Sequence, residues 1–156
     1  MSTRIAILIF DELTALDAIG PYEVLSRIPG VELRFVAREP GVKRTDTGAL
    51  GMEADLALGD LPDPDVVLVP GGQGNRPLLE DDEVLDWLRA VHEGTTWTTS
   101  VCTGSLVNFS GSEEPVSRRN AIMTAATPAA RMPAEIHSSQ RWVFGELSLG
   151  ADVCIA

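Results

Sequence analysis

The sequence predicts one α/β domain with an open, mostly parallel sheet and helices on both of its faces. Short apolar runs alternate along residues 1–107 with segments of helical spacing. Several runs are apolar throughout, which is typical of strands that are buried on both faces. Strand–helix alternation of this kind favours parallel pairing, because each helix carries the chain back across the sheet.

The first elements follow from short local patterns. Residues 5–10 are a continuous apolar run and predict the first strand. A helix is expected next, with Pro21 in its first turn and its end near Ile28. Residues 31–36 alternate between apolar and polar side chains and predict the second strand. The turn-rich residues 39–51 leave room for a short hairpin.

The second half of the predicted sheet begins after a loop or short helical turn at residues 55–60. Residues 66–69 predict a third buried strand, and residues 95–101 predict a fourth. Between them, apolar side chains at helical spacing predict a helix over residues 77–92. The loops after the strands meet at one edge of a parallel sheet, where such folds bind their ligands. These loops follow Phe10, Val36, Val69 and Val101.

The chain changes character after Val107. Residues 108–140 contain no clear strand and no long amphipathic helix, and residues 141–149 predict a final hairpin. We therefore expect a single domain over residues 1–156, in which the part after about residue 107 lacks the clear strand and helix patterns of the rest.

The composition restricts the classes of function. The net charge of −11 disfavours binding to nucleic-acid phosphates. No apolar run approaches the roughly 18 residues of a membrane span, and the N-terminus does not have the pattern of a signal peptide. Cys102 and Cys154 are too few for a disulfide framework, so two reduced thiols in a cytoplasmic protein are expected. No metal-ligand spacing and no dinucleotide fingerprint is present, so no cofactor is expected.

Cys102 lies where an apolar strand meets a glycine-containing turn. A nucleophile on a sharp strand-to-helix turn projects into the crevice, with backbone N–H groups of the next helix around it. These amides favour a thiolate, and Gly104 lets the turn tighten without a clash at Cβ. The alternative is a buried and inert cysteine, which is the commoner fate of a free thiol.

Two further signals accompany this cysteine. Gly71 and Gly72 follow the third predicted strand, where they either free backbone N–H groups for a ligand or form a plain tight turn. Asp17 lies in an apolar run and is either a helix cap or a buried functional carboxylate. Glu23 is the competing acid, but its place on an amphipathic helix indicates a solvated side chain. His92 and His137 do not have a spacing that predicts a Cys–His pair.

Four motifs in this order resemble those of the DJ-1/PfpI superfamily, which is also called class I glutamine amidotransferase-like. They are ILIFDE at 7–12, LDAIGPYEVL at 16–25, VPGGQG at 69–74 and TSVCTGSLV at 99–107. The resemblance implies a flavodoxin-like α/β/α sandwich with the nucleophile at a strand-to-helix elbow. It implies that Cys102 is the nucleophile and Asp17 its acidic partner. The pocket would be lined by Gly71, Gly72, Gln73 and Thr103.

Within this superfamily the sequence most resembles the isonitrile hydratases. Protease-like members carry a histidine directly after the nucleophile, where this chain has Thr103. The resemblance implies that Cys102 attacks the terminal carbon of an isonitrile, with Asp17 assisting proton transfer, and that water then releases an N-substituted formamide. It also implies a small-molecule substrate, no cofactor and a homodimer. The alternatives are a non-catalytic redox- or ligand-sensing domain and a glyoxalase- or deglycase-like activity. The segment after Val107 departs from the family pattern, which puts catalysis in question.

Overall fold

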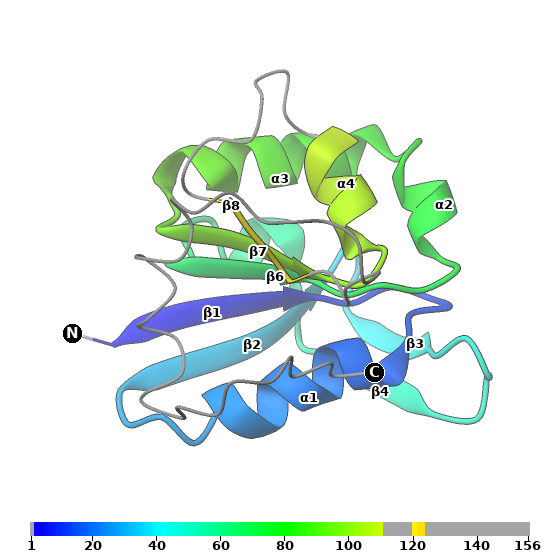
Figure 1. The fold of residues 1–156 in the computed structure, drawn as a ribbon, viewed down its shortest axis with the longest axis horizontal. Helices are drawn as coiled ribbons and strands as arrows, with labels where there is room; N and C mark the ends of the chain where they lie inside the picture. Colours follow the sequence, from blue (N-terminus) through cyan, green and yellow to red (C-terminus); the bar gives the residue numbers. More distant parts are fainter. Residues whose placement is uncertain (1, 111–119, 124–156) are drawn as a thin grey trace, which may run out of the picture. The chain divides into compact units, whose positions relative to one another are not determined.

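Six strands form one sheet in which every pair of neighbours is parallel (Figure 1). The computed structural model describes residues 2–110 and 120–123, all of which belong to one compact unit, Met1–Thr124. In sheet order the strands are β5 (Leu56–Ala57), β2 (Val31–Ala37), β1 (Thr3–Leu8), β6 (Val66–Val69), β7 (Trp97–Val101) and β8 (Asn120–Met123). The predicted parallel α/β fold is confirmed.

Helices cover both faces of this sheet. The helix α1 (Ala15–Leu25) packs on one face, and α3 (Asp82–Gly94) and α4 (Gly104–Ser110) pack on the other (Figure 1). This is the expected three-layer arrangement. A short helix, α2 (Asn75–Leu78), follows the loop after β6.

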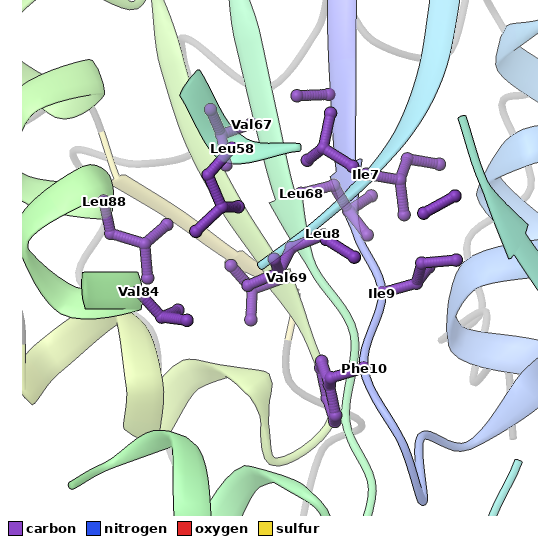
Figure 2. Close-up of a cluster of buried hydrophobic side chains, with 14 of the residues drawn as sticks. Ile7, Leu8, Ile9, Phe10, Leu58, Val67, Leu68, Val69, Val84 and Leu88 are labelled. Atoms are coloured by element: carbon purple, nitrogen blue, oxygen red, sulfur yellow. The ribbon is translucent and has the colours of Figure 1, made fainter. Parts of the chain in front are cut away.

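The core between sheet and helices is almost wholly aliphatic. Ile7 and Leu8 of β1 and Val67 of β6 are at most 1% exposed. Val84 and Leu88 of α3 point toward these strands (Figure 2). Each such side chain contributes about 1.5–3 kcal/mol when it leaves water. The continuous apolar runs of the sequence are therefore the inner strands of the sheet.

The helix α1 begins earlier than Pro21 predicts. It starts at Ala15, so Pro21 lies inside it and the carbonyl of Asp17 has no helical N–H partner at that position. Ala18 is fully buried, and this packing of the first turns outweighs the local preference of proline for a helix start. The helix also ends at Leu25, before the expected Ile28.

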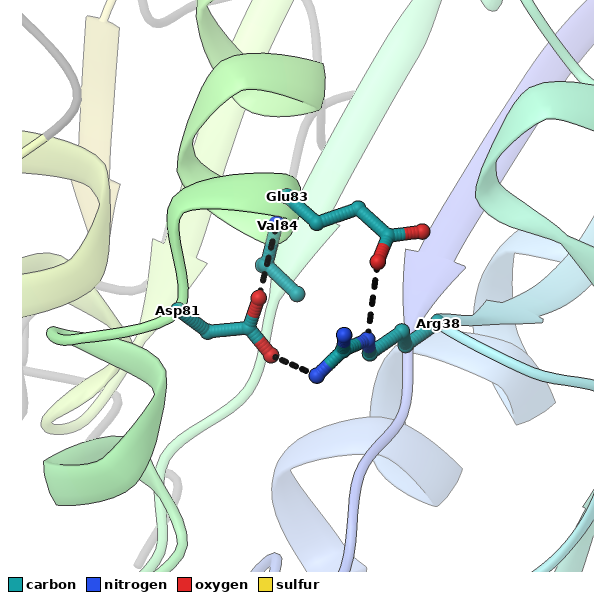
Figure 3. Close-up of polar contacts among 4 residues, drawn as sticks. All are labelled: Arg38, Asp81, Glu83 and Val84. Atoms are coloured by element: carbon teal, nitrogen blue, oxygen red, sulfur yellow. Dashed lines mark hydrogen bonds and ion pairs between the residues drawn. The ribbon is translucent and has the colours of Figure 1, made fainter.

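The helix predicted over residues 77–92 is two helices. The break occurs because Asp81 has an extended backbone, with φ −96° and ψ 93°, and its side chain accepts a hydrogen bond from the Val84 N–H. An aspartate that caps a helix in this way fixes the start of α3. Asp81 and Glu83 also pair with Arg38, which follows β2 (Figure 3).

The remaining differences concern short strands. The expected hairpin is present as β3 (Gly41–Arg44) and β4 (Gly51–Ala54), and the expected helical turn is η1 (Leu58–Asp60). β5 and β8 were not predicted, because neither carries a clear local strand pattern; β5 has only two residues and is defined by its pairing with β2, and β8 by its pairing with β7. The hairpin predicted at 141–149 lies outside the described residues.

Candidate active site

Cys102 occupies the sharp turn between β7 and α4. β7 ends at Val101 and α4 begins at Gly104. The φ angle of Cys102 is 55°, in the left-handed region that side chains rarely adopt. Such strain persists only where the surrounding structure holds it, and it is common at functional sites. The predicted strand-to-helix turn is therefore present, and the Cys102 side chain is half-buried.

Gly71 and Gly104 allow the chain to close around this turn. A Cβ atom on Gly104 would lie 2.2 Å from the Val69 carbonyl oxygen. A Cβ atom on Gly71 would lie 2.7 Å from both Asp17 Oδ2 and the Cys102 Cβ. Since neither distance is possible for real atoms, both glycines are required for this close packing.

Asp17 lies against Cys102 inside the fold. Its side chain is 7% exposed, and its Oδ2 accepts a hydrogen bond of 3.0 Å from the Gly71 N–H. Burial raises the pKa of Asp17 above its ordinary value, and the nearby charge of Asp46 adds to this, while hydrogen bonds from Gly71 and from the Cys102 side chain oppose it. The carboxyl therefore keeps its proton to a higher pH than an exposed aspartate. The structure brings together the two residues that the sequence singled out.

The backbone of Leu13 joins the site to the β3–β4 hairpin. Leu13 forms isolated bridges with Thr45 of the hairpin and with Gly72. The Thr14 hydroxyl donates a hydrogen bond of 3.2 Å to Asp46 Oδ2. The hairpin thus delivers a second carboxylate near the start of α1, which sequence reasoning missed because the contact joins segments 32 residues apart.

The residues expected to line the pocket have different surroundings. The Gly71 N–H donates to Asp17, and the Gly72 N–H donates to Thr103 Oγ1 at 3.1 Å. Both amides therefore have partners within the protein. Gln73 and Thr103 are exposed. Asn75, which sequence reasoning also missed, donates to the same Thr103 oxygen at 2.9 Å; its one local signal is a polar residue directly after the glycine-rich turn.

Neither histidine nor metal chemistry is evident in the part of the chain that the structure describes. His92 Nδ1 lies 2.8 Å from Thr98 Oγ1, on α3 and away from the Cys102 turn. His137 lies outside the described residues. Among residues 2–110 and 120–123, no three His, Cys, Asp or Glu side chains could hold a metal ion. None of the helices in these residues has the length and apolar character to cross a membrane.

Two hollows lie at the same edge of the sheet but do not contain the thiol. One, of about 470 Å³, is lined by Arg38, Pro77 and the acidic residues that begin α3. The other, of about 290 Å³, includes Phe10, Lys43 and Arg38 in its wall. Neither is lined by Cys102 or Asp17. The hydrogen bonds of the predicted site residues converge at the Cys102 turn and not at these hollows.

The sequence is similar to those of known proteins. The model of the DJ-1/PfpI family matches residues 3–112. The chain belongs to the DJ-1/PfpI family. The described site residues all lie within the matched segment.

One curated relative is the isonitrile hydratase of Pseudomonas putida. It is 39% identical over 107 residues, which cover 69% of this chain and 46% of that protein. The chain thus spans about half the length of this relative.

Solved structures of the family share the fold. A ThiJ/PfpI family protein from Pseudomonas syringae superposes with a TM-score of 0.73 at 21% identity, over 80% of this chain and 63% of that one. DJ-1beta of Drosophila melanogaster gives a TM-score of 0.64 at 21% identity, over 71% and 61% of the two chains. At such identities these structures support the fold alone.

Proposed function

We propose that the protein is a cysteine-dependent hydratase that adds water to a small isonitrile and forms an N-substituted formamide. The observation that carries the proposal is the position of the buried Asp17 carboxyl beside Cys102 at a strained strand-to-helix turn, where one Cβ atom on Gly71 would touch both Asp17 Oδ2 and the Cys102 Cβ. The 39% identity to an isonitrile hydratase supports the choice of substrate.

The proposed reaction has two steps. The sulfur of Cys102 attacks the terminal carbon of R–N≡C, a carbon–sulfur bond forms, and Asp17 gives its proton to that carbon. The product of this step is a thioimidate. Water then adds to the thioimidate carbon, and one of its protons goes to the nitrogen. The carbon–sulfur bond breaks as the other proton returns to Asp17, which releases R–NH–CHO and the Cys102 thiolate. A carboxyl whose pKa is raised by burial suits the first step, because it gains a proton more readily than an exposed aspartate.

The residues around Cys102 are proposed to hold the substrate in different ways. Thr103, which follows Cys102 in the chain, and Gln73, in the loop after β6, are exposed and are assigned to substrate contact. Gly71 and Gly72 are assigned to the pocket wall, where their amides hold Asp17 and Thr103.

The test is to incubate the purified protein with alkyl and aryl isonitriles and to measure the formamides by mass spectrometry. We expect formamide to accumulate in proportion to enzyme and time. Absence of formamide from every isonitrile, with intact-mass analysis showing an unmodified Cys102, would reject the proposal.

A redox-sensing role is the second candidate, and the free, half-buried thiol favours it. Mild peroxide followed by mass spectrometry decides: reversible oxidation of Cys102 supports a sensor, and an unmodified Cys102 argues against it. Glyoxalase- or deglycase-like chemistry has less support, because His92 contacts Thr98 rather than the site.

The protein is further proposed to act as a homodimer in the cytoplasm. Four large apolar side chains on α1 and the turn after it support a dimer, because they are 38–50% exposed; they are Leu16, Tyr22, Val24 and Ile28. The cytoplasm supplies the reduced thiol that the reaction needs. Sedimentation equilibrium tests the dimer, and a monomer at all concentrations would reject it.

A further inference from the structure

The Thr103 hydroxyl accepts two hydrogen bonds from the loop after β6. The Gly72 N–H lies 3.1 Å from Thr103 Oγ1, and Asn75 Nδ2 lies 2.9 Å from the same oxygen. A hydroxyl oxygen has two lone pairs, so both are used by these donors. Since Thr103 directly follows Cys102 in the chain, the two bonds hold the Cys102 turn against the segment that follows β6.

Asn75 is buried with one of its side-chain polar atoms unpaired among the described residues. Asn75 is 2% exposed. Among the described residues, its Oδ1 atom is buried without a hydrogen-bond partner. An acceptor that leaves water without gaining a partner is destabilising, whereas a leucine of similar size would carry no such cost. What asparagine provides here is the bond from Nδ2 to Thr103.

Cys102 needs a restraint of this kind because its backbone conformation is strained. A φ of 55° is unfavourable for a residue with a side chain and requires restraint on both sides. On the helix side, the Ser105 hydroxyl donates to the Cys102 carbonyl oxygen at 3.2 Å. On the loop side, the restraint is the Thr103 hydroxyl, held by Gly72 and Asn75 next to Gly71.

We propose that Asn75 is a positioning residue for Cys102, which acts through the Thr103 hydroxyl and keeps the thiol at Asp17. The role deepens the proposed hydratase function and rests on it for the reaction itself. It also applies to the attack of Cys102 on any electrophile, so it can be measured without an isonitrile.

The experiment compares Asn75→Leu, Thr103→Val, their double variant and Thr103→Ser with the wild type. The readouts are the rate of iodoacetamide alkylation of the Cys102 peptide, followed by mass spectrometry, and the Tm of Asn75→Leu. We expect Asn75→Leu to slow alkylation about three- to tenfold, the range of one net hydrogen bond, with Tm unchanged or raised. Thr103→Val should slow alkylation to a similar extent, and Thr103→Ser should restore the wild-type rate.

The double variant provides the decisive comparison. If Asn75 acts through Thr103, the double variant reacts no more slowly than either single variant, because the second change removes nothing further. Additive losses, an unchanged rate in Asn75→Leu, or a joint fall of rate and Tm in that variant would each overturn the role. Failure of Asn75→Leu to fold would also overturn it, because the role predicts a fold at least as stable as the wild type.

Formamide production by the same proteins separates the two proposals. Slower alkylation in Asn75→Leu, combined with no formamide from the wild type, supports the positioning role and rejects the hydratase. Normal alkylation in Asn75→Leu, combined with formamide from the wild type, rejects the positioning role and supports the hydratase.

Discussion

Two polar clusters lie at the carboxyl edge of the sheet, and they are built on different physical principles. The Arg38 cluster, made of Arg38, Asp81 and Glu83, joins β2 to α3 through ion pairs of 2.9 and 3.1 Å (Figure 3). The Cys102 cluster joins α1, the loop after β6 and the turn after β7 through hydrogen bonds. Its members are Asp17, Gly71, Gly72, Asn75, Cys102 and Thr103.

The two clusters differ most in their exposure to water. The Arg38 side chain is 56% exposed and that of Glu83 is 59% exposed, so water and salt screen their attraction. Asp17 is 7% exposed, Asn75 is 2% exposed, and Gly71 leaves no room for one additional carbon atom. The larger hollow lies beside the exposed cluster. At this edge of the sheet, the larger hollow and the buried polar contacts therefore lie at different places.

Among the changes that test the difference between the two clusters, loss of the Cys102 thiol should have the largest effect. Cys102→Ser is expected to lower formamide production by about 10³-fold or more, because the attacking thiolate is removed. Steady-state turnover with an isonitrile measures it, and Cys154→Ser serves as the matched control with wild-type turnover. Equal activity in Cys102→Ser would remove the Cys102 cluster from the mechanism.

A methyl group added at Gly71 should have the second-largest effect. In Gly71→Ala the new Cβ would lie 2.7 Å from Asp17 Oδ2 and from the Cys102 Cβ. We expect a loss of about 1–3 kcal/mol in the free energy of unfolding and about a 10²-fold loss of turnover. Gly59→Ala is the control, because a Cβ at Gly59 has no atom within 4 Å. Similar losses in both variants would show that the cluster is not tightly packed.

The Asp17 carboxyl should make stability depend on pH. Its pKa is raised in the folded protein, so its contribution to stability is present below about pH 4, the ordinary pKa of aspartate, and is lost as pH rises through the folded-state value. Asp17→Asn lacks this dependence, so its stability relative to the wild type should increase from acidic to neutral pH. Urea denaturation of both proteins across this range measures the difference.

Asp46→Asn sharpens the same prediction. Removing the Asp46 charge should lower the pKa of Asp17, since that charge helps to raise it. The loss of stability with rising pH should then be smaller and should be complete at a lower pH, whereas Asp55→Asn, an exposed control at the end of the same hairpin, should leave it unchanged. A wild type that gains stability relative to Asp17→Asn with rising pH would contradict the direction of the Asp17 pKa.

Disruption of the Arg38 cluster should have the smallest effect. Arg38→Met removes both ion pairs but retains much of the apolar stem of the side chain, so Tm should change little and the change should shrink further in high salt. Differential scanning calorimetry at low and high ionic strength measures it. A large, salt-independent fall in Tm would mean that the Arg38 cluster contributes substantially to the stability of the fold.

The sequence predicted the inner strands and the strand-to-helix turn at Cys102, because both depend on local features. A continuous apolar run is sufficient for β1 and β6, and Gly104 after Cys102 indicates the turn. The approach of Asp17 to Cys102 came from family resemblance, since no local spacing places α1 beside β7. Asn75 and Asp46 were missed because their contacts join segments 28 and 32 residues apart. The break before α3 was missed because the acidic residues Glu80 to Glu83 are compatible with either a helix interior or a helix cap.

The parallel order of the sheet has a consequence for synthesis of the chain. β1 pairs with β6 through contacts such as Ile5 with Val66, which are 61 residues apart. At translation rates of about 5–20 residues per second, the ribosome needs roughly three to twelve seconds to supply that partner after β1 is made. During this interval the apolar run IAILIF at 5–10 has β2 and α1 to cover it, but neither β6 nor α3. The nascent chain is therefore most exposed to aggregation and to chaperones before residue 69 emerges, well before Cys102 has been made.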